Sequence, residues 1–308
     1  MLYESCDEFY IFQTTRDMLL NIIIILIFVI NVALSAHIMD DMILTEQQYN
    51  QIAGIRNSVY DDGSFASGIN NEAYRWPDGQ MPYVFSNSFA SYQKNIVKDE
   101  INYFNDIFDG CLKIRPKNDE DSHHVVLENE GTMGCGSSNV GKLPGAGKQT
   151  IRIVCFRRRT ILHEFIHAFG FTHEQNRPDR DDYVEIHEDN IDPAAIGNFQ
   201  KDNGYEQTYF VRYDFKSIMH YHTKAFSKNG YQKTITSKIP GISDNEISSE
   251  DMTPSDILKL KRMYGCDPLL NYLERVKCPD DVGREGCPKE HIRYTHVIPE
   301  RQMYCNFK

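Results

Sequence analysis

Hydrophobic residues recur along the chain at helical spacing, in short runs and in one long run. Between residues 89 and 108 the apolar side chains follow a helical period, which predicts an amphipathic helix. A second helix is predicted at 255–263, with Pro254 near its start. Short apolar runs bounded by turn residues predict strands at 81–85, 112–114, 125–127, 151–154 and near 231–236.

The long run is MLLNIIIILIFVINVALSA, residues 18–36, and it ends in small residues. An apolar stretch followed by small residues is typical of a secretory signal peptide, with cleavage after Ala36. The alternative is a membrane anchor, because the run approaches the length that spans a bilayer. Met18 is a second candidate for the initiator, since seventeen residues precede the run. We expect a secreted, extracellular protein with no membrane attachment after signal cleavage.

Three other stretches show little apolar pattern. Residues 37–56 are polar and short of aromatic side chains, and we expect them to contribute little to a core. The glycine-rich stretch 131–147 predicts a flexible loop. Residues 267–308 contain three cysteines and resemble an appended tail rather than a second core.

The stretch HEFIHAFGFTHE contains three histidines and begins at His163. A helix over 161–169, with Thr160 as its cap, places His163 and His167 one turn apart on the same face. Gly170 is suited to ending that helix, so that the chain turns back and His173 completes a set of three metal ligands. Three protein ligands leave a fourth position open, which is typical of a catalytic zinc ion, one per subunit.

Glu164 follows the first histidine directly and projects toward the edge of this metal site. A carboxylate at that position can take a proton from zinc-bound water and pass it to a leaving amine. Zinc lowers the pKa of its water from ~15.7 to about 7, so the reaction is possible at neutral pH. The pattern therefore predicts a zinc hydrolase in which Glu164 is the general base.

Charge and cysteine content narrow the classes of partner. The formal net charge is −11, which argues against nucleic acid. The cluster Arg157, Arg158 and Arg159 favours a solvated loop over a binding patch.

In an oxidising compartment the eight cysteines should pair, but loss of the leader removes Cys6 and leaves seven. We expect a monomer; the alternative is that the odd cysteine of the tail links subunits.

The histidine motif, together with SIMHY at 217–221 and NRPDRDDYV at 176–184, resembles the astacin family of secreted zinc endopeptidases in the metzincin clan. The resemblance covers about residues 57–266. It implies an α+β, two-lobed zincin-like domain with an active-site helix and a twisted mixed sheet. It also implies cleavage of internal peptide bonds in proteins, with the substrate extended across the cleft.

The resemblance assigns further roles to residues near the motif. Met219 would form an apolar floor beneath the zinc. Tyr221 would be a switchable fifth ligand that also stabilises the oxyanion during catalysis. Glu174 would bind the amino terminus of the mature enzyme. The implied disulfides are Cys111–Cys266 and Cys135–Cys155, and the second would clamp the glycine-rich loop at the rim of the cleft.

The segment before this domain resembles an astacin propeptide, which we assign to residues 37–56. Asp41 would occupy the open zinc position and keep the proenzyme silent, and Asp40 is the alternative. Arg56–Asn57 resembles an activation junction, although the long stretch that follows leaves the mature start open. The expected organisation is a leader at 1–36, the propeptide, a catalytic domain at 57–266 and the tail at 267–308.

Two alternatives to a secreted endopeptidase stay open. The first is the same enzyme with residues 18–36 retained as a membrane anchor. The second is a secreted binding module that kept the fold without activity, for which loss of a ligand or of Glu164 is expected. The sequence retains all three histidines and Glu164.

Overall fold

The computed structural model describes residues 37–46, 48–49, 72–131, 134–202 and 211–267. The expected leader at 18–36, the junction Arg56–Asn57 and residues 268–308 of the tail lie outside this part. None of the helices in the described ranges combines the length and apolar character needed to cross a membrane.

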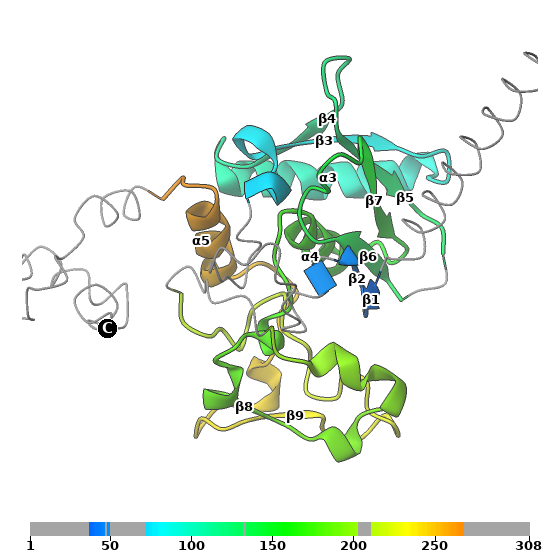
Figure 1. Cartoon of the computed structure of the whole chain (residues 1–308). Helices are drawn as coiled ribbons and strands as arrows, with labels where there is room; N and C mark the ends of the chain where they lie inside the picture. Colours follow the sequence, from blue (N-terminus) through cyan, green and yellow to red (C-terminus); the bar gives the residue numbers. More distant parts are fainter. Residues whose placement is uncertain (1–36, 47, 50–71, 132–133, 203–210, 268–308) are drawn as a thin grey trace, which may run out of the picture.

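A mixed seven-stranded sheet organises the upper lobe in Figure 1. Its strand order is β1-β2-β6-β7-β5-β3-β4. The pairs β2–β6, β7–β5, β5–β3 and β3–β4 are parallel, whereas β1–β2 and β6–β7 are antiparallel. The strands are β1 His37–Met39, β2 Met42–Leu44, β3 Gln80–Phe85, β4 Lys113–Pro116, β5 His124–Glu128, β6 Gly136–Asn139 and β7 Lys148–Ile153.

Helix α3, Ser91–Phe108, is the helix predicted from apolar spacing, and it buries that apolar face. The ring of Phe104 stacks on Phe169 at a centroid distance of 5.2 Å. Phe169 follows the last residue of helix α4, so this contact fixes the end of α4 against α3. The histidine-bearing helix therefore rests on the main hydrophobic core.

Helix α4, Arg158–Ala168, begins earlier than predicted, and Thr160 as its cap is wrong. The cap position belongs to Arg157, which has extended backbone angles and makes no capping hydrogen bond through its side chain. Gly170 does lie just beyond the helix, with φ +113°. A Cβ there would lie 2.8 Å from Cε of Met263, so both backbone angle and space favour glycine.

Two segments expected to lie outside the core belong to the sheet. The glycine-rich stretch contains β6, all four of whose residues are buried. Its small side chains allow close packing against α4. In the segment 37–56, the three-residue strands β1 and β2 form a hairpin whose turn is Asp40 and Asp41. Strand β2 then pairs with β6, which joins the hairpin to the sheet. Met39, Met42 and Leu44 are thereby buried, so the expectation that this segment adds little to the core is wrong.

The lower lobe has little regular structure and a separate hydrophobic cluster. Its antiparallel pair is β8, Val184–Ile186, with β9, Ile235–Ser237. Helix α5, Pro254–Met263, then returns to the core of the upper lobe. The 3₁₀ helices are Glu72–Tyr74, Pro77–Gly79, Glu174–Asn176, Arg180–Asp182, Glu188–Asn190, Pro193–Phe199 and Asp244–Glu246. The fold is the α+β, mixed-sheet architecture that the sequence predicted.

Two disulfides join parts of the chain that are distant in sequence. Cys111, after α3, is bonded to Cys266, just beyond α5. Cys135, before β6, is bonded to Cys155, after β7. The first bond ties α5 to the upper lobe, and the second fixes the strand next to the histidine helix.

Candidate active site

Three histidines converge where α4 ends. His163 and His167 project from one face of α4, and the turn at Gly170 brings His173 back beside them. The Nε2 atoms of His163 and His173 are 3.3 Å apart. Together with a carboxylate oxygen of Asp41, the three histidines form a group whose ligand atoms all lie within 4.8 Å of one another. This is the convergence that the spacing of the motif predicted.

Backbone contacts orient the imidazoles for metal binding. Nδ1 of His163 lies 3.0 Å from the carbonyl oxygen of Ile218, and Nδ1 of His167 lies 2.6 Å from that of Phe171. A carbonyl can only accept, so each Nδ1 carries the proton and each Nε2 keeps a free lone pair. Nε2 of His167 is buried without a hydrogen-bond partner among the described residues. An imidazole set of this kind fits a zinc ion.

Burial also favours the neutral form of two of the three imidazoles. It lowers the pKa of both His163 and His173, and the nearby Asp41 carboxylate only partly opposes the shift. A neutral imidazole is the form that binds a metal. The electrostatics of the site therefore agree with its hydrogen bonding.

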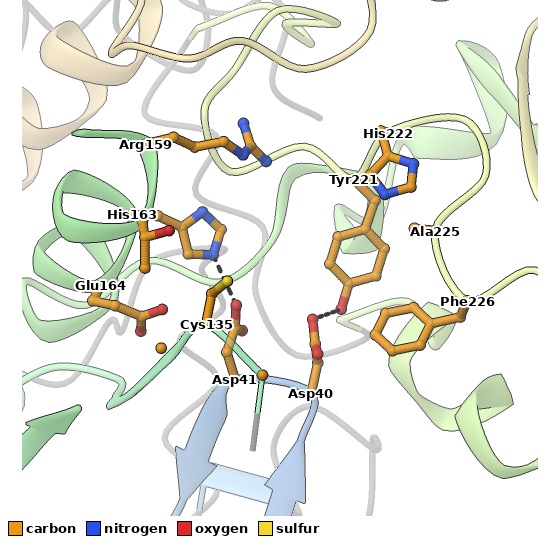
Figure 2. Close-up of a pocket in the computed structure, with 13 residues that line it drawn as sticks. Asp40, Asp41, Cys135, Arg159, His163, Glu164, Tyr221, His222, Ala225 and Phe226 are labelled. Atoms are coloured by element: carbon orange, nitrogen blue, oxygen red, sulfur yellow. Dashed lines mark hydrogen bonds and ion pairs between the residues drawn. The ribbon is translucent and has the colours of Figure 1, made fainter. Parts of the chain in front are cut away.

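The turn of the β1–β2 hairpin places Asp41 directly over the histidines. Its carboxylate oxygens lie 3.1 Å from Nε2 of His163, 3.3 Å from that of His167 and 3.1 Å from that of His173. The alternative residue, Asp40, points elsewhere and accepts a 2.7 Å hydrogen bond from the Tyr221 hydroxyl. Figure 2 shows the two neighbouring carboxylates directed to opposite walls of the pocket.

Glu164 lies beside the histidines with 2% of its surface exposed. Burial raises the pKa of its carboxyl well above the usual value, and the charges of Asp41 and Asp40 raise it further. Oε2 has no hydrogen-bond partner among the described residues. A buried carboxylate with a raised pKa and a free oxygen is a strong candidate for a general base.

Gly136 of β6 makes the room that Glu164 needs. A Cβ at this position would overlap Oε1, Cδ and Cγ of Glu164. We expect Gly136→Ala to displace the carboxylate and lower kcat roughly 10²-fold, at the lower end of what general-base catalysis contributes, with zinc content unchanged. Peptide hydrolysis and metal analysis check this. Gly197→Ala, where a Cβ meets nothing within 4 Å, should behave as wild type; equal rates for both variants would contradict the assignment.

Tyr221 and Met219 flank the site from the turn that follows Ser217. The Tyr221 ring lies 4.6 Å from that of His173, centroid to centroid, and burial raises the pKa of its hydroxyl well above the usual value. Tyr221 is therefore a neutral donor whose present acceptor is Asp40. Met219 is 3% exposed and belongs to the core of the upper lobe.

Glu174, next to the third histidine, is fully paired among the described residues. Its Oε2 binds the ammonium group of Lys259, and its Oε1 accepts from Arg177 at 3.0 Å and from the Asp214 amide at 2.9 Å. Burial opposes the charge, but these partners lower the pKa of Glu174 to about 2. The role expected for it, binding the amino terminus of the mature enzyme, stays a prediction.

His163 and Glu164 line a pocket of about 610 Å³ between the lobes. Arg159, four positions before His163 on α4, also lines this pocket, and Figure 2 shows it on the side of His163, across from Tyr221. Its guanidinium donates to the carbonyl oxygens of Ser249 and His220, and burial lowers its pKa. One wall of the pocket thus carries a cation that the sequence suggested would lie in a solvated loop.

Asp202 is a buried acid that the sequence did not reveal, because nothing in its local pattern marks it. It is 0% exposed and accepts a 2.5 Å hydrogen bond from Thr172, the residue before His173. Its Oδ1 has no partner within the described ranges. Burial raises the pKa of this carboxyl from 3.8 to about 7. Between these two pH values the folded protein therefore holds a proton on Asp202 that the unfolded chain has lost.

This proton gives a pH dependence of stability. The contribution of the Asp202 proton to the free energy of unfolding is complete below the unfolded pKa of 3.8 and is lost as the pH rises through about 7. Between pH 5 and 8 we expect the unfolding free energy of the wild type to fall about 3 kcal/mol more than that of Asp202→Asn. Urea unfolding with excess chelator measures it. The exposed Asp189→Asn should follow the wild type, and identical losses in all three proteins would refute the effect.

The fold and the site together define a class: a two-lobed α+β domain with a three-histidine metal site and an adjacent buried glutamate. Comparisons with known proteins narrow the class further. The model of the Astacin family of peptidases matches residues 68–265. This match covers well over half of the chain, so the chain belongs to the astacin family, in which such a histidine triad binds zinc.

Individual relatives agree with the family. Zinc metalloproteinase nas-15 of Caenorhabditis elegans is 35% identical over 207 residues, covering 67% of this chain and 35% of that protein. Human meprin A subunit beta is 33% identical over 215 residues, covering 70% of this chain and 30% of that protein. This chain thus spans about a third of the length of these two relatives.

One solved structure covers the domain almost completely. High choriolytic enzyme 1, a hatching enzyme zinc-protease from Oryzias latipes, is 28% identical with a TM-score of 0.54. The alignment covers 68% of this chain and 99% of that chain. The similarity in fold therefore extends over nearly the whole of that solved chain.

Proposed function

We propose that the chain is a secreted zinc endopeptidase, made as a proenzyme, that hydrolyses internal peptide bonds of proteins. The observation that carries the proposal is the convergence of three buried histidines beside the buried Glu164. Family membership supports it, because the motif residues are intact in this chain. A silent binding module would have no need for a buried carboxylate with one oxygen left without a partner in the described part of the chain.

The residues of the site divide the chemistry between them. His163, His167 and His173 hold zinc, which supplies a Lewis acid that activates water and polarises a carbonyl group. Glu164 takes a proton from the attacking water and delivers it to the leaving amine. Tyr221, once released from Asp40, donates its hydroxyl to the oxyanion of the substrate. Met219 supports the histidines from the hydrophobic core.

The β1–β2 hairpin supports a proenzyme. Its turn carries Asp41 to the histidines and Asp40 to Tyr221, so it covers both the metal position and the oxyanion donor. The hairpin also pairs with β6, which is the strand nearest the pocket. Removal of the segment 37–56 would free that strand edge for an extended substrate.

Secretion and domain organisation follow from the same proposal. The two disulfides fit an oxidising compartment, and the apolar run at 18–36 fits a signal peptide. We assign residues 1–36 to the leader, 37–56 to the propeptide, 57–266 to the catalytic domain and 267–308 to the tail. A membrane-anchored form differs only in retaining 18–36, and N-terminal sequencing of released protein distinguishes the two.

The proposal is tested with an unfolded protein substrate such as casein. Chain from which the propeptide has been removed should convert casein to internal fragments, and phenanthroline should stop the reaction. Release of single terminal residues alone would contradict an endopeptidase.

A further inference from the structure

We propose that Asp256 and Lys259 of α5 are positioning residues for the zinc site, although they lie more than 80 positions after the histidines in sequence. The inference rests on the proposed zinc function and names residues that act on it indirectly. The two side chains are separated by three positions, so they share one face of α5. Both are buried, with 3% and 5% of their surface exposed.

Asp256 holds the turn on which His163 depends. Its Oδ1 accepts a 2.5 Å hydrogen bond from the Ser217 hydroxyl, and its Oδ2 accepts a 3.0 Å bond from the Ile218 amide. The carbonyl of the same Ile218 is the acceptor for Nδ1 of His163. One carboxylate thus fixes the residue that sets the orientation and tautomer of the first zinc ligand.

Lys259 holds the segment that contains the third ligand. Its ammonium group binds Oε2 of Glu174, the residue immediately after His173. The Glu174 amide in turn donates to the Met219 carbonyl at 3.1 Å. Lys259 is therefore linked through Glu174 both to the third histidine and to the turn that Asp256 holds.

The two segments are also cross-linked by a side chain. Oε1 of Gln175 accepts a 3.0 Å hydrogen bond from the Tyr221 amide. Gln175 is 0% exposed, so this contact is shielded from water. The face of α5 thus supports one connected unit carrying His163, His173 and Tyr221, whereas His167 is oriented by the Phe171 carbonyl next to α4.

This geometry assigns α5 a function beyond packing. Residues that orient metal ligands typically change metal affinity about 10–100-fold when they are removed. The Cys111–Cys266 disulfide ties the end of α5 to α3, so the support is itself anchored to the upper lobe. Zinc affinity therefore depends on a helix that contributes no ligand.

The test measures zinc binding rather than activity. In the full chain, Asp256→Asn and Lys259→Met should each weaken zinc binding about 10–100-fold in competition with a calibrated chelator. The rise in unfolding temperature on adding zinc to chelated protein should shrink accordingly. A purely structural role would lower the unfolding temperature with and without zinc by the same amount and leave the affinity unchanged.

Two control variants separate positioning from general stability. Lys261→Met changes the same residue type on another face of α5. Asp251→Asn removes the charge of a carboxylate that accepts from Tyr103 at 2.8 Å and forms an ion pair with Arg158, and that makes no contact with the segments carrying Ile218 and Glu174 among the hydrogen bonds and ion pairs of the described residues. Both should bind zinc as the wild type does.

A milder variant covers the case in which a buried charge change prevents folding. Ser217→Ala removes one of the hydrogen bonds to Asp256 and a 3.1 Å bond from the Met219 amide, but leaves both buried charges in place, so it should weaken zinc binding by a smaller factor in the same direction. If the wild type binds zinc and all three variants match it, the positioning role is wrong while the proposed function stands. If the wild type binds no zinc, both are wrong.

Discussion

Glu164→Gln is expected to keep its zinc and lose peptide hydrolysis by a factor of about 10²–10⁴, the contribution typical of a general base. Glutamine has nearly the same shape but cannot take a proton from water. Zinc should be retained because Glu164 is not part of the group of facing ligand atoms. Initial rates on a fluorogenic peptide and metal analysis of the same sample give both numbers.

Stability provides a second readout for this variant. Burial raises the pKa of Glu164, which means that its charge is unfavourable in the folded protein. The glutamine variant should therefore unfold at the same temperature as the wild type or higher. Glu185→Gln, at an exposed position of β8, is the matched control and should change neither rate nor stability. Full activity in Glu164→Gln would exclude the base assignment.

Asp41→Ala is expected to activate the uncleaved chain. Its carboxylate lies beside the Nε2 atoms of all three histidines, so Asp41 would be the fourth ligand of a zinc ion held there, and the alanine variant loses this ligand. If this ligand stabilises the closed hairpin by about 3 kcal/mol, a peptide substrate should be cleaved roughly 10²-fold faster than by the wild-type proenzyme. The rate is measured at early times, with gel analysis showing that the chain is still intact.

Asp40→Ala is the matched comparison on the same turn. It loses one hydrogen bond, from the Tyr221 hydroxyl, worth about 1 kcal/mol and hence roughly a fivefold change in rate. Asp41 should therefore dominate latency, with Asp40 adding a smaller effect. An Asp41→Ala proenzyme as silent as the wild type, or a larger effect at Asp40, would overturn this division.

Much of the site could be predicted because its geometry is local. The three histidines lie within eleven residues. Helix geometry places His163 and His167 on one face, and the glycine before His173 lets the chain turn back, so their convergence follows from this short stretch alone. The same holds for α3, where a long apolar period dominates the pattern. Predictions from residue spacing and apolar periodicity succeed where the residues concerned lie in one helix or directly after it.

The errors arise where tertiary contacts override local pattern. Nothing local in the short polar β6 predicts burial, yet it is enclosed between β2, β7 and α4. The hairpin of Asp40 and Asp41 has three-residue arms, which are too short for periodicity to detect. The contacts of Asp202 and Asp256 depend on partners 30 or more positions away. A capping pattern at Thr253 does mark Asp256 as a helix-start residue, but not its second role.

The central claim is that zinc held by the three histidines, with Glu164, cleaves internal peptide bonds. The most direct measurement is a zinc titration of chelated, propeptide-free chain, with casein cleavage followed at each step. The rate should rise from near zero in proportion to added zinc and level off at about one equivalent per chain, as expected for one tight site. Cleavage that persists at the full rate in the chelated protein, or that never appears at any zinc concentration, would contradict the claim.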